Sequence, residues 1–268
     1  MLKLAQANFS PLMDLIPPPA IRRSLTVLGF GISICPAAEL RPLSTDRPDT
    51  TESPYTVDAG HFQFEMEIAA LTRAGDYRDG SFGQLNSKIG LDALTDLQLV
   101  TPFYTQVRHG EEGFGDTQVR LKRNFWGNDE GPTALAVMPF IQLPTSSGDL
   151  GSDAWEGGVI VPFAFEGPAG WSCAIMGELD LEANENSGYH LVGLTSATTS
   201  HPLTEQLGAF FELVNVLSAE SAADWEAYFN TGMTWLVTPT WQLDGGIRLG
   251  LTAASADFSP FLGVSTKF

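Results

Sequence analysis

Charged side chains recur at every second position in several segments that are otherwise apolar. Within residues 61–68, Glu65 and Glu67 alternate with Phe64 and Met66, so an extended strand would carry the acids on one face. Such groups could pair with one another inside a protein, or they could orient a small molecule that passes along them. The candidates for lining a lumen or a constriction are Glu65, Glu67, Arg108, Arg120, Lys122, Glu178, Asp244 and Arg248.

Side chains that support enzymatic or metal chemistry are present without the spacing that such chemistry needs. The four histidines are His61, His109, His190 and His201, and their scatter predicts neither a metal site nor a cofactor. Serine and histidine occur, but the Gly-x-Ser-x-Gly motif of an activated serine does not. The sequence therefore predicts a protein that is not an enzyme.

The 268-residue chain is acidic, and its charged residues are few for its length. It holds 14 Lys and Arg against 32 Asp and Glu, and the net charge of -18 has the wrong sign for binding nucleic acid phosphates. Charged residues make up 17% of the sequence, whereas a soluble domain is typically about a quarter charged. Much of the surface must therefore be apolar, and nucleic acid is not expected as a partner.

The elements that position these side chains are predicted to be strands, because the dominant period of the sequence is two. If the apolar face meets lipid, Phe64 and Leu99 face the membrane, whereas Glu65 and Arg120 face the lumen. The sequence thus predicts an all-β fold, a closed antiparallel up-and-down transmembrane β-barrel of about 12 strands over residues 61–268. The predicted strands cover 61–73, 81–91, 96–108, 116–126, 132–143, 155–165, 171–181, 188–200, 206–216, 224–237, 241–251 and 258–268.

The connections between these strands alternate between short turns, such as 92–96 and 127–131, and longer polar links, such as 73–80, 109–115 and 144–153. This alternation is typical of a barrel with tight periplasmic turns at one rim and exposed loops at the other. Both ends of the barrel then fall on the short-turn side. The tryptophans next to predicted short turns, where membrane-interface aromatics belong, are Trp126, Trp171, Trp235 and Trp241.

Residues 1–38 are expected to be a signal peptide region. An arginine pair precedes the apolar run 25–34, and the run is followed by the small residues of Cys35-Pro-Ala-Ala38. The run is too short to span a bilayer as a helix, and translation could start at Met13. A twin-arginine signal and lipidation of Cys35 are the alternatives.

The last predicted strand ends the chain on an aromatic residue, Phe268. A terminal phenylalanine preceded by alternating, mostly apolar residues resembles the signal that the outer-membrane assembly machinery reads. Phe268 is therefore a candidate assembly signal, and the cell outer membrane is the expected location. The residues that share its face are Phe258, Pro260, Leu262, Val264 and Thr266.

Five segments resemble a known family: Thr45–Pro54, Val57–Glu65, Gly115–Lys122, Pro139–Thr145 and Glu156–Pro162. They are similar to the transporter family named for a meta-pathway of phenol degradation, and the likeness runs from about residue 40 to the C-terminus. The resemblance implies an outer-membrane β-barrel that passes small, often aromatic, organic molecules. It implies no catalytic residue.

Residues 39–60 precede the first predicted strand and are rich in Pro, Thr, Asp and Glu, a composition that cannot build a core. The segment could be a disordered periplasmic tail. Alternatively, it folds into the barrel mouth as a plug, where Asp46, Arg47, Asp49 and Glu52 would pair with lumen charges. Prolines within the segment would lower the entropic cost of ordering it.

Three functions are compatible with these patterns. The first is an outer-membrane channel for passive uptake of small organic, including aromatic, molecules, with membrane lipid, the assembly machinery and the permeant as partners. The second is a non-conducting structural or receptor barrel. The third is a soluble secreted β-barrel binding protein, which dependence on detergent would distinguish from the other two.

Overall fold

The structure, a computed structural model, describes residues 40–107, 110, 112–129, 131–148, 150–184, 188–220 and 223–268. The predicted leader over 1–38 lies outside these residues. Leu40–Phe268 form one compact unit built of strands, because each alternating segment has one face for lipid and one for the interior. The elements are β1 (Phe62–Ala74), β2 (Tyr77–Asp92), β3 (Thr95–Val107), β4 (Glu112–Gly113), β5 (Thr117–Trp126), β6 (Thr133–Leu143), β7 (Glu156–Glu166), the 3₁₀ helix η1 (Pro168–Gly170), β8 (Ser172–Ala183), β9 (Tyr189–Pro202), β10 (Leu207–Ser218), β11 (Glu226–Thr238), β12 (Trp241–Gly250) and β13 (Phe258–Lys267).

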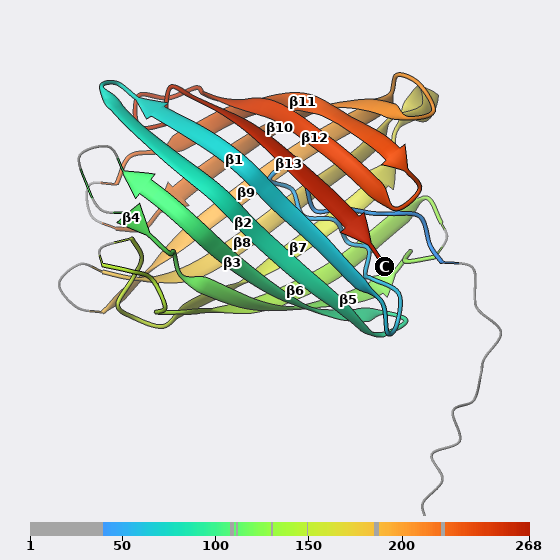
Figure 1. Cartoon of the computed structure of the whole chain (residues 1–268), viewed down its shortest axis with the longest axis horizontal. Helices are drawn as coiled ribbons and strands as arrows, with labels where there is room; N and C mark the ends of the chain where they lie inside the picture. The colour runs from blue at the N-terminus through green and yellow to red at the C-terminus, as the bar shows by residue number, and fades with distance from the viewer. Residues whose placement is uncertain are drawn as a thin grey trace, which may run out of the picture. The chain divides into compact units, whose positions relative to one another are not determined.

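The thirteen strands found in the described part of the chain form one sheet that closes on itself. Neighbouring strands pair antiparallel, and the β1–β13 ladder joins the first strand to the last. β4 has two residues and pairs only with the end of β3, so the other twelve strands make the barrel wall (Figure 1). This confirms the predicted closed, antiparallel up-and-down barrel.

The predicted strand boundaries lie within a few residues of the observed ones, except at the start of β2. The sequence predicts a long link over 73–80, and this is wrong, because only Gly75 and Asp76 separate β1 from β2. Ala74 pairs with Tyr77, so the ladder continues through residues whose polarity is typical of a loop. Gly75 adopts the positive φ of 58° that such a tight turn favours.

Part of the predicted link 109–115 is strand as well. β5 pairs with β3 only over Thr95–Val100, which leaves the far end of β3 with a free edge that β4 fills. The predicted lumen residue Arg108 adjoins this region and lies outside the described residues.

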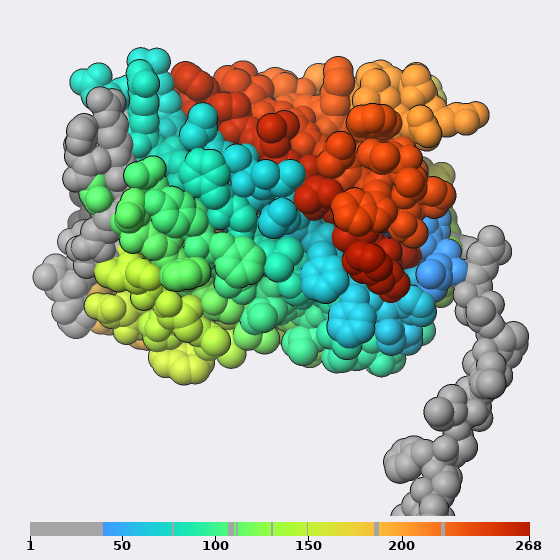
Figure 2. Space-filling view, in the orientation of Figure 1, coloured from blue at the N-terminus to red at the C-terminus, as the bar shows by residue number. Residues whose placement is uncertain are grey.

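The outer face of the barrel is apolar, as the alternation predicts. Leu99 on β3 is 44% exposed, whereas its neighbour Gln98 is fully buried. Figure 2 shows the outer surface of β1, β2, β3 and β13, which belongs to this face. Other large apolar side chains exposed on the wall are Leu97, Phe103, Leu121, Ile141, Ile175, Leu213, Met233, Leu243 and Leu262. Such a belt is stable against hydrocarbon and not against water, so the fold places this protein in the outer membrane.

Three of the four tryptophans that were predicted to lie beside short turns, Trp126, Trp235 and Trp241, are exposed at the ends of their strands. Trp171 follows η1 and packs its ring against that of His201, with centroids 4.9 Å apart. Among the described residues no helix is long and apolar enough to cross a membrane.

The inner face has two chemically different walls. On β1, β2 and β5 the buried side chains are charged, as Glu65, Lys88 and Lys122 show. On β6 and β7 they are apolar, and with Met176 of β8 they form one cluster of Met138, Phe140, Ile160 and Met176, although Glu178 on β8 also faces the lumen. The lumen is therefore polar on one side and apolar on the other.

Deleting Phe268 is expected to reduce outer-membrane assembly several-fold. Its backbone N–H donates to the Phe62 carbonyl oxygen at 2.8 Å, and its ring lies 6.1 Å from that of Phe64, so the deletion removes the last contacts of the β1–β13 seam. The measurement is the fraction of protein that migrates as a folded band on unboiled gels of outer-membrane fractions. Phe268→Tyr keeps both contacts and should assemble normally. Equal assembly of the deletion variant would contradict the prediction.

Candidate functional site

Residues 40–60, called here the lumen segment, fold into the barrel at the end where the chain terminates (Figure 1). Hydrogen bonds connect the segment to β1, β2, β5, β10 and β12, so strands surround it on several sides. Asp46, Thr51 and Val57 are buried, although the segment contains no helix and no strand longer than a single bridge. Polar contacts with the wall replace secondary structure as the source of its order.

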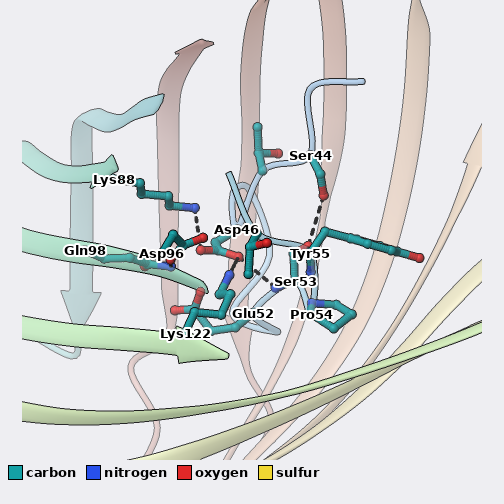
Figure 3. Close-up of polar contacts among 12 residues, drawn as sticks. Ser44, Asp46, Glu52, Ser53, Pro54, Tyr55, Lys88, Asp96, Gln98 and Lys122 are labelled. Carbon is teal, nitrogen blue, oxygen red and sulfur yellow. Dashed lines mark hydrogen bonds and ion pairs between the residues drawn. The ribbon is translucent and has the colours of Figure 1, made fainter. Parts of the chain in front are cut away.

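Asp46 lies at the centre of a buried charge cluster (Figure 3). Its carboxylate accepts hydrogen bonds from Lys122 Nζ at 2.6 Å, from Lys88 Nζ, and from the Ser53 backbone N–H at 2.8 Å. Glu65 also accepts from Lys88 Nζ and from the Asp46 backbone N–H at 2.9 Å. Two acids and two lysines thus compensate one another out of contact with water, which makes the loss of any one of them costly.

Arg47 connects the segment to both sides of the barrel seam. Its guanidinium donates to Asp244 Oδ1 on β12 at 2.8 Å and to Glu67 Oε2 on β1 at 3.4 Å. Arg248 donates to the same Glu67 oxygen at 2.8 Å. Gly263 leaves the room for this, because a Cβ there would lie 2.2 Å from Arg47 Nη2.

Glu212 on β10 anchors the next part of the segment. Its carboxylate accepts hydrogen bonds from the backbone N–H groups of Thr50 at 2.9 Å and Thr51 at 2.7 Å. The Thr51 hydroxyl and Asn230 Nδ2 donate to it as well, at 2.6 Å and 2.7 Å. Four donors therefore satisfy the hydrogen-bonding capacity of a carboxylate that is 1% exposed.

Beyond this anchor the segment turns along the boundary between the two walls. Glu52 accepts a 2.6 Å hydrogen bond from Arg120 Nη1 on β5, and its backbone N–H lies 3.2 Å from Met176 Sδ on β8. The carbonyl oxygen of Pro54, which is almost fully buried, accepts from Asn124 Nδ2 at 2.9 Å. At the rim, Asp58 pairs with Arg41 at 2.7 Å and with Lys267 at 3.2 Å. The segment is thus held along its whole length.

The charge states of the segment acids follow from their neighbours. Burial raises the pKa of Asp46, but the charges of Lys122 and Lys88 outweigh it and hold the pKa far below its ordinary value of 3.8. Burial and then the carboxylate of Glu212 raise the pKa of Asp49 to about 8. At neutral pH Asp46 is therefore ionised, whereas Asp49 carries a proton.

Insertion of the lumen segment is expected to weaken as the pH rises from about 4 to about 8, because inserted Asp49 holds a proton that it would lose on release. Asp46 has the opposite shift, and its contribution falls only in strong acid, below this window. Single-channel recordings at pH 5 and pH 8 should show more open events at pH 8. Asp49→Asn, which cannot titrate, should reduce the difference, and part of it should remain because burial and then the charge of Asp46 raise the pKa of Glu52 to about 7. Fewer open events at pH 8 in the unmodified chain would contradict the prediction.

Of the cavities that adjoin the lumen segment, two lie beside its central residues, 45–55. One, of about 380 Å³, is bounded by Asp49 and Thr51–Tyr55 of the segment and by strand ends near the short turns. The other, of about 280 Å³, is bounded by Asp46–Thr50, by Arg120 and Arg248, and by wall residues farther from that rim. The wall side chains alone therefore do not fill the lumen, and the segment is what separates the two cavities.

The structure places the described lumen candidates on the inner face, and six of them hydrogen bond to the lumen segment or pair with a residue that does: Glu65, Glu67, Arg120, Lys122, Asp244 and Arg248. Glu178 on β8 also lies on the inner face of the barrel, but it forms no hydrogen bond or ion pair with a described residue of the lumen segment. Asp46, Arg47, Asp49 and Glu52 all lie in the lumen, where each faces a charged wall residue. Within the described chain, no group of three or more His, Cys, Asp or Glu side chains is placed to hold a metal ion.

Sequence reasoning missed several wall residues that hold the segment, among them Lys88 and Glu212. Lys88 stands in a stretch of small and polar residues where alternation is weak, and Glu212 stands between two apolar neighbours in β10. A single charge within an apolar membrane strand is itself a signal for a buried partner, and it could have identified Glu212.

Comparison with solved structures shows the same fold in two outer-membrane proteins. The crystal structure of an outer-membrane channel from Pseudomonas putida F1 matches with a TM-score of 0.61 and 15% sequence identity, over 84% of this chain and 100% of that one. The NanC porin matches with a TM-score of 0.57 and 10% identity, over 77% of this chain and 100% of that one. No curated protein matches the sequence.

A family model described as "Putative MetA-pathway of phenol degradation" matches residues 45–268. The match takes in most of the lumen segment and every strand of the barrel, so it covers the site as well as the fold. The chain therefore belongs to this family, and it is an outer-membrane β-barrel.

Proposed function

We propose that this protein is an outer-membrane channel for passive uptake of small organic molecules, aromatic ones included, and that the lumen segment closes it in the state described here. The observation that carries the proposal is the pair of cavities, of about 380 and about 280 Å³, on either side of the segment. A barrel whose lumen is divided by one removable segment becomes a continuous path when that segment moves.

The two walls of the lumen support a cargo that is part polar and part apolar. A phenol-like molecule offers one hydroxyl to the charged wall of β1, β2 and β5, and an apolar ring to the wall of Met138, Phe140, Ile160 and Met176. The family description, which refers to phenol degradation, agrees with such a cargo.

The second candidate is a non-conducting structural or receptor barrel. It is favoured by the Asp46 cluster, because buried ion pairs of this kind hold a segment in one place and resist its withdrawal. A soluble secreted binding protein is not supported, since its surface would have to expose the apolar belt to water.

The test is single-channel recording together with liposome swelling, on the full chain and on a variant that lacks residues 41–59. Neutral phenol-sized solutes should enter liposomes that contain either protein, and faster with the deletion variant. Migration as a folded band on unboiled gels confirms that each protein is intact. No uptake by either folded protein would remove the channel function and leave the structural barrel.

A further inference from the structure

The larger cavity lies between the lumen segment and the short-turn rim, and its lining is mixed in character. Hydroxyls come from Thr198 and Ser200 on β9 and from Thr234 on β11. Apolar surface comes from Ala174 on β8 and Phe210 on β10, the ring of which is 3% exposed. Hydroxyls beside a small apolar surface, within about 380 Å³, are typical of a site for a small molecule with one polar group.

Charge in this cavity disfavours anions. Among the described lining residues Arg47 is the one cation, and its guanidinium is occupied by Asp244 at 2.8 Å and Glu67 at 3.4 Å. The lining also includes Glu166, which forms no ion pair with a described residue. An anionic ligand would therefore meet acids without a free cation, and in a narrow space of low dielectric that repulsion is strong.

A buried cation would be held no better, because Glu166, a lining acid without an ion pair to a described residue, is exposed to solvent, where its charge is screened. The Glu52 carboxylate already pairs with Arg120 at 2.6 Å, and Glu212 is satisfied by four donors. Asp49 is protonated at neutral pH, so it offers a hydrogen-bond donor and not a compensating charge. Desolvating an ammonium group without a counter-charge costs more than one hydrogen bond returns.

We propose that this cavity is a binding vestibule for small neutral hydroxylated aromatic molecules, in which Asp49 and the β9 hydroxyls bind the ligand's hydroxyl group and Phe210 packs against its ring. The inference rests on the proposed channel function and adds an equilibrium site on the short-turn side of the lumen segment. The same geometry makes the vestibule discriminate against aromatic acids.

The experiment measures protection of an introduced thiol in the full chain, in detergent at pH 7. Cys35 and Cys173 are first replaced by alanine. Ala164→Cys on β7 then reports on the vestibule without removing a ligand-binding hydroxyl, and Gln84→Cys in the other cavity is the matched control. The probes are phenol, which is uncharged at this pH, benzoate and benzylammonium, and the readout is the rate of reaction with a small neutral thiol reagent.

Phenol is expected to slow labelling of the Ala164→Cys variant about tenfold and to leave the Gln84→Cys variant unaffected, whereas benzoate and benzylammonium protect neither. Each Asp49 substitution is made in the variant that carries the vestibule cysteine. Asp49→Asn keeps a hydrogen-bond donor and should keep the protection by phenol, whereas Asp49→Leu should abolish this protection. Absence of protection by phenol, or equal protection by benzoate or benzylammonium, would overturn the proposal. Protection without liposome swelling would retain the vestibule and reject the channel, and swelling without protection would do the reverse.

Discussion

Replacing Asp46 with asparagine is expected to release the lumen segment and to raise single-channel conductance more than any other single change in the lumen. The substitution leaves Lys88 and Lys122 buried with Glu65 as the one remaining acid of the cluster. Breaking a buried ion pair by removing one partner costs about 3–5 kcal/mol, which is enough to shift a segment held by a few such contacts. Conductance in planar bilayers and protease access to the segment are the measurements.

Two matched variants test whether charge is the cause. Lys122→Met in the Asp46→Asn background removes one unpaired ammonium and should restore part of the closure. Asp129→Asn removes a rim acid that pairs with Arg41 of the segment and is 71% exposed; such exposed ion pairs contribute about 0–1 kcal/mol, so conductance should change little. If Asp46→Asn lowers the stability of the barrel and leaves conductance unchanged, the cluster is structural and the segment is not a gate.

Leu99→Arg is expected to destabilise the folded barrel in lipid by about 2–4 kcal/mol, the cost of a cationic side chain facing the bilayer midplane. Leu99 lies in the first half of β3, pairs with Ser87 and Val119, and is 44% exposed on the outer face. Together with Phe64 and Leu97 it lines an apolar groove on the outer face. Urea titration of the protein folded in vesicles measures the free energy of unfolding.

Leu91→Arg is the control, because Leu91 is also exposed but stands at the short-turn end of β2. There the arginine can reach the interface, and the cost should fall to about 0–1 kcal/mol. Arg123 already shows this behaviour, since it lies on the outer face near the same rim and donates to Asp92 at 3.2 Å. Equal costs at Leu91 and Leu99 would mean that the membrane does not cover this face as described.

The sequence by itself determined the wall of the barrel. Alternation with a period of two assigned Phe64 and Leu99 to the lipid face and Glu65 and Arg120 to the lumen, and in the structure Leu99 is exposed whereas Glu65 is buried. The reason is local, because successive side chains of a strand point to opposite faces whatever the partner strand is. Local polarity and strand pairing disagree at the β1–β2 turn, at Gly75 and Asp76. The loop predicted there from polarity was wrong, because the hydrogen-bonded pairing of β1 with β2 continues up to the turn.

Only the tertiary structure decided which charges meet. Arg47 and Asp244 are 197 residues apart and Thr51 and Glu212 are 161 apart, and closure of the β1–β13 seam brings both pairs together. Composition left the segment open to two interpretations, a tail or an inserted strap, because a stretch with so few apolar residues has no periodicity of its own. The segment is ordered by hydrogen bonds to side chains on the strands that surround it. These strands surround it only after the sheet has closed into a barrel, so the sequence of the segment alone does not determine its position.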